Sequence, residues 1–144
     1  VGATFGAPER TVCMFTGDGG FQMNIQELGT IMENQCPVKV ILMNNNYLGN
    51  VRQWQDMFFG QRKSFTRMLN PHYQLIADAY HIPYEVVIDR KDLKAAIEKM
   101  LATDGPFILE CAVKEEDNVA PMIAPGASID EMMLEINIET KLDC

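Results

Sequence analysis

The sequence has few basic residues, and they do not cluster. It carries 12 Lys and Arg against 20 Asp and Glu, so its formal net charge is −8. Basic residues are adjacent only at positions 62–63 and 90–91. Because nucleic-acid binding needs clustered Lys and Arg to contact phosphates, nucleic acid is excluded as an expected partner.

Long apolar runs and cysteine pairs are also missing. No apolar stretch reaches the length of a membrane span and no signal peptide is visible, so we expect no membrane partner and a cytoplasmic location. The four cysteines, Cys13, Cys36, Cys111 and Cys144, form no C-x-x-C pair. Cys13 and Cys111 lie inside apolar, strand-like runs, which predicts buried free thiols rather than metal ligands or disulfides.

Apolar residues are plentiful enough for one domain. The chain has 144 residues, of which 47% are hydrophobic, so residues 1–144 can form a single domain with a real core. It opens at Val1 without an initiating Met or a charged leader. We interpret it as a C-terminal fragment of a larger enzyme that ends in a tail over residues 114–144.

Strand-like and helix-like patterns alternate along the chain. Apolar runs predict buried strands, and apolar residues at helical spacing predict amphipathic helices. One of these helices should begin after Asn24 as the N-cap, with Glu27 three residues on, and end near Asn34. The predicted strands are Thr11–Thr16, Val38–Met43, Tyr84–Ile88 and Phe107–Val113, and the other predicted helices are a segment from about Asn50, Tyr73–Tyr80 and Lys91–Leu101. The alternation predicts an α/β fold, a parallel sheet with helices on both faces.

Two polar clusters follow the first two predicted strands. Gly17-Asp18-Gly19-Gly20 ends the first strand, and Asn44-Asn45-Asn46 ends the second. Asp18 and Asn45 are 45 − 18 = 27 residues apart, about one strand–helix–strand unit, so their side chains should converge at one edge of the sheet. A carboxylate and an amide oxygen suit Mg²⁺ or Ca²⁺, and glycines let the backbone approach a phosphate group.

The two clusters could also be ordinary turns or belong to other phosphate-binding motifs. G-D-G and N-N are each common in ordinary turns, and only their paired spacing at strand ends favours a binding site. The chain contains no G-x-x-x-x-G-K-[ST] and no G-x-G-x-x-G after the first strand, so a P-loop and a dinucleotide fingerprint are excluded. His72 and His81 have no carboxylate or cysteine at ligand spacing and are expected to be structural or to lie at the surface.

G-D-G, twenty-four intervening residues and Asn44-Asn45 resemble the diphosphate-binding motif of thiamine diphosphate enzymes. The resemblance implies that Asp18, Asn45 and the main-chain carbonyl of Tyr47 hold Mg²⁺, which bridges the cofactor diphosphate. The cofactor-binding residues implied in this way are Gly17, Asp18, Gly19, Gly20, Asn45, Tyr47, Leu48, Gly49 and Asn50.

Longer segments are similar to one family, the large catalytic subunits of acetolactate synthase. They are G-D-G-G-F-Q-M-N-I-Q-E-L-G-T, P-V-K-V-I-L-M-N-N-N-Y-L-G-N-V-R-Q-W-Q and A-P-M-I-A-P-G-A-S-I-D-E-M. The resemblance covers nearly the whole chain and implies the C-terminal, diphosphate-binding domain of such a subunit. It also implies that Trp54 lines a substrate and inhibitor channel and that the tail closes over the active site as a lid.

The activity implied by the resemblance is the decarboxylating condensation of pyruvate with a second 2-oxo acid. The products are 2-acetolactate or 2-aceto-2-hydroxybutyrate, in branched-chain amino acid biosynthesis. The family's activating glutamate belongs to another domain, usually across a subunit interface, so no catalytic residue is expected here and the chain alone should be inactive. The implied full-length protein is a homo-oligomer, a dimer or tetramer. Whether it also binds FAD or a regulatory small subunit is left open.

Two alternatives remain at this point. The chain could belong to another thiamine diphosphate-dependent 2-oxo acid decarboxylase or oxidase, because these share the core motif. It could also be a non-catalytic association module that keeps the fold, although such a module would not need the Asp18 and Asn45 pair.

Overall fold

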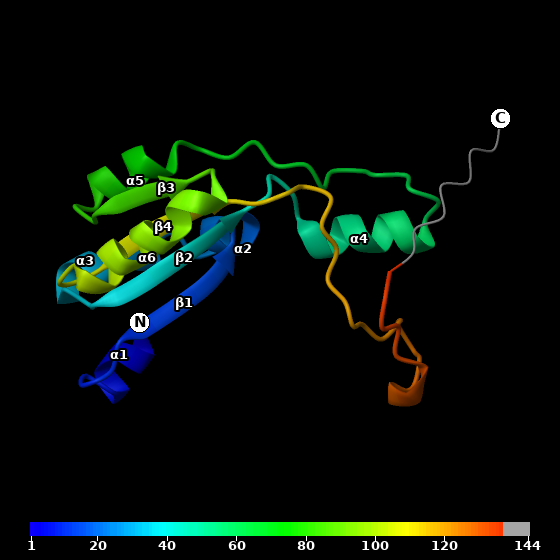
Figure 1. The fold of residues 1–144 in the computed structure, drawn as a ribbon, viewed down its shortest axis with the longest axis horizontal. Helices are drawn as coiled ribbons and strands as arrows, with labels where there is room; N and C mark the ends of the chain where they lie inside the picture. Colours follow the sequence, from blue (N-terminus) through cyan, green and yellow to red (C-terminus); the bar gives the residue numbers. More distant parts are fainter. Residues whose placement is uncertain (137–144) are drawn as a thin grey trace.

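A computed structural model describes residues 1–136 and contains one parallel sheet of four strands (Figure 1). The strands are β1 (Val12–Gly17), β2 (Val38–Asn44), β3 (Tyr84–Val87) and β4 (Phe107–Ala112). They lie in the order β1-β2-β4-β3, and all three neighbouring pairs are parallel. The α/β parallel sheet expected from the sequence is therefore confirmed.

Helices cover both faces of this sheet, as predicted. α2 (Asp18–Met23), α3 (Glu27–Asn34) and α5 (Tyr73–Ala79) contribute to the core on one face. α6 (Leu93–Ala102) packs on the other face, where Ala96 and Met100 meet β4. Successive residues of a strand point to opposite faces, so the buried residues of β2 and β4 divide between the two cores.

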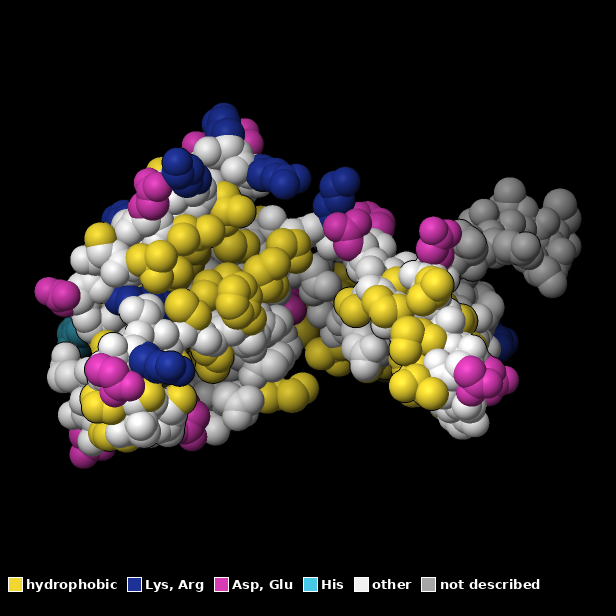
Figure 2. All heavy atoms as spheres, turned by 60° about the horizontal axis from the view of Figure 1, so that its bottom comes forward, with side chains coloured by type: hydrophobic (Ala, Val, Ile, Leu, Met, Phe, Trp, Pro, Cys, Tyr) yellow, Lys and Arg dark blue, Asp and Glu magenta, His cyan; other side chains and the backbone are white. Residues whose placement is uncertain are grey.

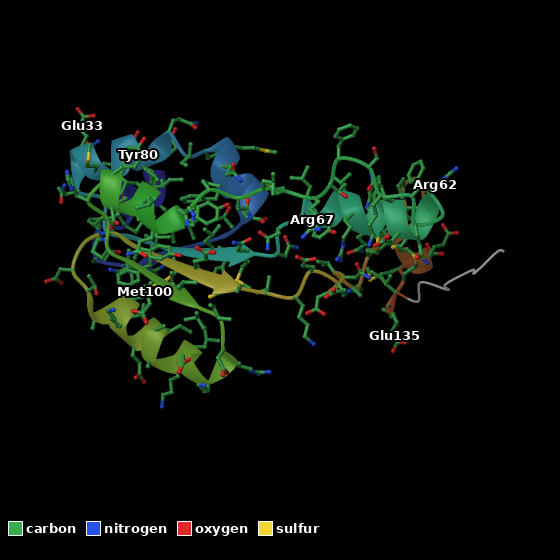
Figure 3. All side chains as sticks on the ribbon, turned by 90° about the horizontal axis from the view of Figure 1, so that it is seen from above. Glu33, Arg62, Arg67, Tyr80, Met100 and Glu135 are labelled. Carbon is green, nitrogen blue, oxygen red and sulfur yellow. The ribbon has the colours of Figure 1, made fainter. Side chains whose placement is uncertain are left out.

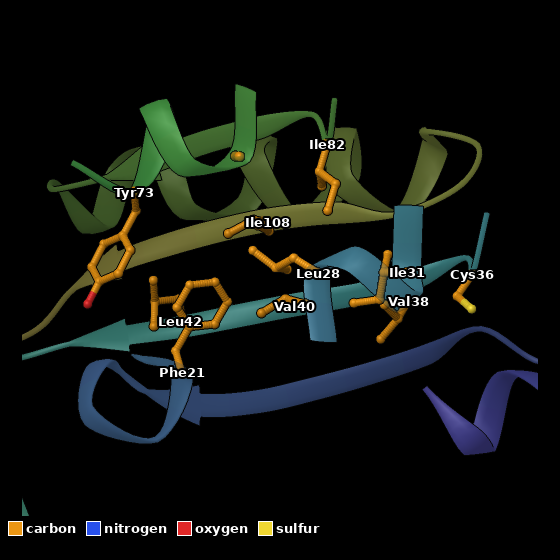
Figure 4. Packing of buried hydrophobic residues seen from close by; sticks show 11 residues of the cluster. Phe21, Leu28, Ile31, Cys36, Val38, Val40, Leu42, Tyr73, Ile82 and Ile108 are labelled. Carbon is orange, nitrogen blue, oxygen red and sulfur yellow. The ribbon is translucent and has the colours of Figure 1, made fainter. Parts of the chain in front are cut away.

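The core under α2, α3 and α5 is the larger of the two. Figure 4 shows the side chains of Phe21, Leu28 and Tyr73 directed toward the strands. The ring of Phe21 meets the ring of Tyr73 edge to face, with 5.5 Å between the centroids. The buried hydrophobic residues of this core are Phe21, Leu28, Ile31, Cys36, Val38, Val40, Leu42, Tyr73, Ala77, Ile82 and Ile108.

The prediction that the first strand is buried was wrong. Met14 is 39% exposed, Phe15 is 74% exposed, and Cys13, expected to be a buried thiol, is exposed as well. β1 lies at one edge of the sheet, whereas α6 packs on β3 and β4, toward the opposite edge. The register places Phe15 beside Ile41, so Phe15 faces the α6 side, where no helix of residues 1–136 covers β1.

An open apolar hollow results on this side of the sheet. It has a volume of about 550 Å³, and Figure 2 shows hydrophobic side chains gathered over the part of the molecule that holds the sheet. Cys111, predicted to be buried, is buried in β4, and Cys36 is buried between α3 and β2. Cys144 lies outside the described residues.

The predicted start of the helix after Asn24 was also wrong. Asn24 is the C-cap of α2, and its side-chain Nδ2 donates to the carbonyl of Gly20 at 3.0 Å. The glycine-rich segment therefore forms a helix of its own directly after β1, and α3 begins only at Glu27. The predicted end at Asn34 is confirmed, since Gln35 follows in the left-handed conformation.

The remaining elements lie at the start of the chain and beside the sheet. α1 (Gly2–Gly6) precedes β1, and the 3-10 helix η1 (Arg90–Asp92) leads into α6. α4 (Gly49–Phe58) extends away from the sheet, and the chain after β4 passes the beginning of α4 (Figure 1). This last part contains the 3-10 helix η2 (Ile129–Glu131). The last eight positions of the predicted tail, 137–144, lie outside the described residues.

No helix within residues 1–136 combines the length and the apolar character that crossing a bilayer requires.

Candidate functional site

A hollow of about 370 Å³ lies beyond the carboxyl ends of β1 and β2. In parallel sheets this edge is where ligands bind. All nine residues predicted to bind a cofactor line it, together with Met43, Val51 and Val113. The predicted residues that line the hollow are Gly17, Asp18, Gly19, Gly20, Asn45, Tyr47, Leu48, Gly49 and Asn50.

Asp18 is the only carboxylate among the residues that line this hollow, and it is 1% exposed. It is the first residue of α2, directly after β1. Its Oδ1 accepts a hydrogen bond from the backbone N–H of Gly19 at 3.0 Å, and its Oδ2 accepts one from Asn70 Nδ2 at 2.7 Å. Such donors offset the cost of burying a carboxylate.

The loop after β2 supplies the amide and carbonyl groups of the hollow. Asn45 Oδ1 accepts a hydrogen bond from the backbone N–H of Tyr47 at 3.0 Å, and Asn44 Oδ1 accepts one from that of Asn46 at 3.1 Å. Side-chain bonds of this kind fold Asn-rich segments into tight turns. The loop then passes through Leu48 into α4, which begins at Gly49.

Two glycines leave room that a side chain would fill. A Cβ on Gly19 would lie 2.7 Å from Leu48 Cδ2, and a Cβ on Gly49 would lie 2.9 Å from Asn45 Nδ2. Both distances are shorter than a non-bonded contact allows. Gly19 therefore lets the loop after β2 close against the start of α2, and Gly49 lets the start of α4 close against the Asn45 side chain.

Asn70 is the main residue of the site that the sequence analysis missed. Its Nδ2 lies 2.7 Å from Asp18 Oδ2, 2.8 Å from Asn44 Oδ1 and 3.2 Å from Asn46 Oδ1. Its own Oδ1 accepts from Gln22 Nε2 at 2.8 Å. Asn70 lies 52 residues from Asp18 in a stretch without periodicity, so no local pattern could have indicated this role.

The segment before Asn70 runs along the loop after β2. The backbone N–H of Leu48 donates to the carbonyl of Thr66 at 2.8 Å, and that of Met68 donates to the carbonyl of Asn46 at 2.9 Å. Tyr47 and Arg67 form an antiparallel bridge between these two hydrogen bonds. Figure 3 shows Arg67 at the junction between the sheet and α4.

A buried polar network continues from the loop into the sheet. Asn44 Nδ2 donates to Glu110 Oε1 at 2.7 Å, and the hydroxyl of Tyr84 donates to the second oxygen of the same carboxylate. Burial, then the hydrogen bond to Glu110, raises the pKa of Tyr84 above its usual value. Burial also raises the pKa of Tyr73 to about 12, so the hydroxyls of both tyrosines stay protonated at physiological pH.

Trp54 lies apart from the nine residues. It lines a second hollow of about 610 Å³ on α4, together with Asn50 and Val51, which also line the first hollow. Trp54 is 38% exposed, and its ring meets that of Phe58 edge to face with 6.2 Å between centroids. The two hollows are therefore neighbours along α4, and the channel role of Trp54 stays a prediction.

No group of three or more His, Cys, Asp and Glu side chains comes together in the part of the chain from 1 to 136. A cation in the first hollow would thus depend on the single carboxylate of Asp18 and on amide and carbonyl oxygens. This donor set fits Mg²⁺, which takes one or two protein carboxylates and fills its remaining positions with phosphate oxygens and water.

The chain is similar to curated acetolactate synthases. It is 41% identical over 138 residues to the "Acetolactate synthase isozyme 2 large subunit" of Escherichia coli (strain K12), which covers 95% of this chain and 25% of that protein. It is 42% identical over 135 residues to the "Acetolactate synthase large subunit" of Pyropia yezoensis, over 92% of this chain and 23% of that protein. The chain thus spans about a quarter of the length of these relatives.

A solved structure and a family profile give the wider relationship. A Rhodococcus jostii RHA1 thiamine diphosphate-dependent 4-hydroxybenzoylformate decarboxylase superposes with a TM-score of 0.75 at 24% identity, over 82% of this chain and 22% of that one, which shows a shared fold. The profile described as "Thiamine pyrophosphate enzyme, C-terminal TPP binding domain" matches residues 1–111. The chain therefore belongs to the family of C-terminal TPP-binding domains of thiamine pyrophosphate enzymes.

Proposed function

We propose that this chain is the diphosphate-binding domain of an acetolactate synthase large subunit and that it holds thiamine diphosphate through Mg²⁺. In this proposal the Asp18 carboxylate, the Asn45 side-chain oxygen and the Tyr47 carbonyl ligate the cation. The observation that carries the proposal is the single hollow beyond β1 and β2, which all nine predicted cofactor-binding residues line.

The donors in this hollow are compatible with such a cation. The Asp18 carboxylate accepts two hydrogen bonds, from Gly19 and Asn70, and an ionised carboxylate has about four acceptor positions, so it can still bind a metal ion. Gly17, Gly19, Gly20 and Gly49 line the hollow without side chains, so the backbone there is accessible to a diphosphate. The family profile and the acetolactate synthase relatives support thiamine diphosphate as the ligand.

The chemistry then divides between cofactor and protein. When bound, thiamine diphosphate supplies the electron sink for decarboxylating a 2-oxo acid. The residues of this chain bind and orient it: Asp18, Asn45 and Tyr47 fix the diphosphate end, and Trp54 borders the approach along α4. The proposed substrates are pyruvate and a second 2-oxo acid, and the products are 2-acetolactate or 2-aceto-2-hydroxybutyrate for branched-chain amino acid biosynthesis.

The activity belongs to a longer, cytoplasmic, oligomeric protein in this proposal. The glutamate that activates the cofactor comes from another domain in this family, so the chain alone should not turn over pyruvate. Acetolactate formation from pyruvate by the isolated chain would contradict this part of the proposal. FAD and a regulatory small subunit, where present, would bind outside this chain, and the lid role of residues 114–144 is proposed on the same resemblance.

Calorimetric titration with thiamine diphosphate in the presence of Mg²⁺ tests the cofactor site. We expect the chain to bind and Asp18→Ala to weaken binding by about a hundredfold, because the only carboxylate of the hollow is lost. Asp78→Ala, an exposed aspartate on α5, is the matched control and should bind as the parent does. Equal binding by the parent and Asp18→Ala would overturn the assignment of Asp18 to the cation.

A further inference from the structure

Three oxygen atoms converge on one side-chain nitrogen beside the candidate site. Asp18 Oδ2, Asn44 Oδ1 and Asn46 Oδ1 lie 2.7, 2.8 and 3.2 Å from Asn70 Nδ2. They come from the ends of β1 and β2, so one amide group connects the two polar segments that follow neighbouring strands. An NH₂ group carries two hydrogens, and the two shorter contacts, to Asp18 and Asn44, take them with the better geometry.

The Asp18 carboxylate fixes which way this amide faces. A carboxylate oxygen only accepts, so the atom of Asn70 that lies 2.7 Å from Asp18 Oδ2 must be the amide nitrogen, and the oxygen of Asn70 then accepts from Gln22 Nε2 at 2.8 Å. The reverse orientation would place an amide oxygen against three oxygens that only accept. The nitrogen of Asn70 is thus directed at the Asp18 carboxylate by its neighbours on both sides.

Backbone hydrogen bonds outside the sheet hold Asn70 next to Asp18. The hydrogen bonds from Leu48 to Thr66 and from Met68 to Asn46 hold its segment against the loop after β2. Asn70 follows two residues after Met68, and it is not among the residues that line the hollow. It therefore contacts Asp18 without itself lining the space where a ligand would bind.

We propose that Asn70 is a positioning residue that holds the Asp18 carboxylate in the orientation that ligates the cation. This inference rests on the proposed function, since it assigns a role toward the same cation. A buried carboxylate that loses one of two donors can rotate or take up water, and either change moves its oxygens relative to the metal. Partners that orient a metal ligand in this way typically change metal affinity by about tenfold to a hundredfold when removed.

The test measures how much Mg²⁺ the chain needs to bind thiamine diphosphate. Cofactor binding is titrated at a series of Mg²⁺ concentrations for the parent and for Asn70→Ala, and thermal unfolding is recorded for both. We expect Asn70→Ala to raise the Mg²⁺ concentration at half-saturation at least tenfold. Asn34→Ala removes an exposed asparagine on α3 that bonds only within its own helix, and it should leave this concentration unchanged.

Two further variants separate positioning from a loss of stability. Lys39 Nζ in β2 donates to the carbonyls of Thr103 and Gly105, and Lys39 does not line the hollow, so Lys39→Met should destabilise the sheet away from it. An equal rise in the Mg²⁺ requirement for Lys39→Met would overturn the proposal. Gln22→Ala releases the oxygen of Asn70 without removing its amide, and we expect a smaller rise of about twofold to fivefold. If Asn70→Ala does not fold, Gln22→Ala decides the question.

The failures of the two proposals are distinguishable. A parent chain that binds no thiamine diphosphate with Mg²⁺ would overturn the proposed function, and the role of Asn70 with it. A parent that binds, with Asn70→Ala and Gln22→Ala within twofold of its Mg²⁺ requirement, would overturn the role of Asn70 alone.

Discussion

Gly49 packs so closely against the candidate cation ligand Asn45 that no side chain fits between them. Gly49 is the first residue of α4, and a Cβ there would lie 2.9 Å from Asn45 Nδ2, closer than real Cβ contacts come. The rest of the helix would tolerate alanine, which is the better helix former. A side chain at position 49 should therefore displace Asn45 in the candidate site while it leaves α4 stable.

We predict that Gly49→Ala weakens thiamine diphosphate binding in the presence of Mg²⁺ by at least about tenfold, because the methyl group displaces the Asn45 amide. The free energy of unfolding should change by less than about 1 kcal/mol, because the clash falls on a side chain that can move. Calorimetric titration and urea denaturation measure the two effects.

Gly29→Ala is the matched control for this prediction. Gly29 lies inside α3, and its added Cβ would meet only Tyr80 Cε1, at an ordinary 4.0 Å. This substitution should stabilise the chain by about 0.5–1 kcal/mol and leave cofactor binding unchanged. Unchanged binding by Gly49→Ala would show that Asn45 does not need its present position.

Nine residues that line the hollow could be predicted from the sequence because they lie in two short motifs. The segments 17–20 and 45–50 follow two strands that are joined by one helical connection, and parallel neighbours bring their carboxyl ends together. Asn70 could not be predicted in this way. Its partners Asp18 and Asn44 lie 52 and 26 residues away, and its segment is ordered by backbone pairing to a loop rather than by a periodic pattern.

Among the elements, the buried strands were the easiest to predict. β2 is buried over Val38–Leu42 because it lies between two strands and under helices on both faces, and its sequence is almost continuously apolar. β1 has the same apolar composition but lies at the edge, and composition alone does not reveal which side of a strand is covered. The error over Asn24 is similar, because an asparagine can bond to either of two adjacent helices.

One charged residue interrupts the apolar run of β2. Lys39 is 4% exposed, and its Nζ donates to the carbonyls of Thr103 at 2.5 Å and Gly105 at 2.6 Å. Burial lowers the pKa of Lys39, while the nearby carboxylate of Asp104 opposes that shift. The ammonium group therefore binds the turn between α6 and β4 to the amino-terminal part of β2.

We predict that Lys39→Met lowers the free energy of unfolding by about 1–3 kcal/mol, because two carbonyls lose their donor. Urea denaturation followed by circular dichroism measures this change. Lys99→Met is the control: the Lys99 side chain is 63% exposed and pairs with Glu85 at 2.6 Å, and exposed pairs contribute less than about 1 kcal/mol. Equal losses for the two variants would show that the carbonyls at 103 and 105 do not depend on Lys39.

The whole molecule divides into a sheet with its helices and a smaller part built on α4 (Figure 1). Residues 117–122, which we call the strap, cross α4 near its beginning and contact Arg52 and Gln53. Arg52 donates to the carbonyl of Asp117 at 3.0 Å and to Asn118 Oδ1 at 2.9 Å. Gln53 forms two hydrogen bonds with the backbone of Val119. Its Nε2 donates to the carbonyl at 3.0 Å, and its Oε1 accepts from the N–H at 2.7 Å.

These contacts make the strap depend on α4 and not on the sheet. α4 also carries Gly49 and Asn50 at the edge of the candidate site, so the strap and the site share one helix. The Arg52 guanidinium lies 5.6 Å from the centre of the Tyr47 ring, which connects the strap to a residue of the hollow. The position of the strap is thus set by two buried side chains on the helix that borders the site.

We predict that Gln53→Ala releases the strap while the sheet keeps its stability. The amide of Val119 should exchange its hydrogen about fivefold to tenfold faster, because the variant removes its acceptor, whereas the amides of Leu42 and Leu109 in the sheet should be unchanged. Hydrogen exchange followed by NMR measures both, with Gln26→Ala, an exposed residue, as the control. Equal acceleration at Val119 and in the sheet would mean that strap and sheet open as one cooperative unit. Protection at Val119 that survives the variant would mean that Arg52 alone holds the strap on α4.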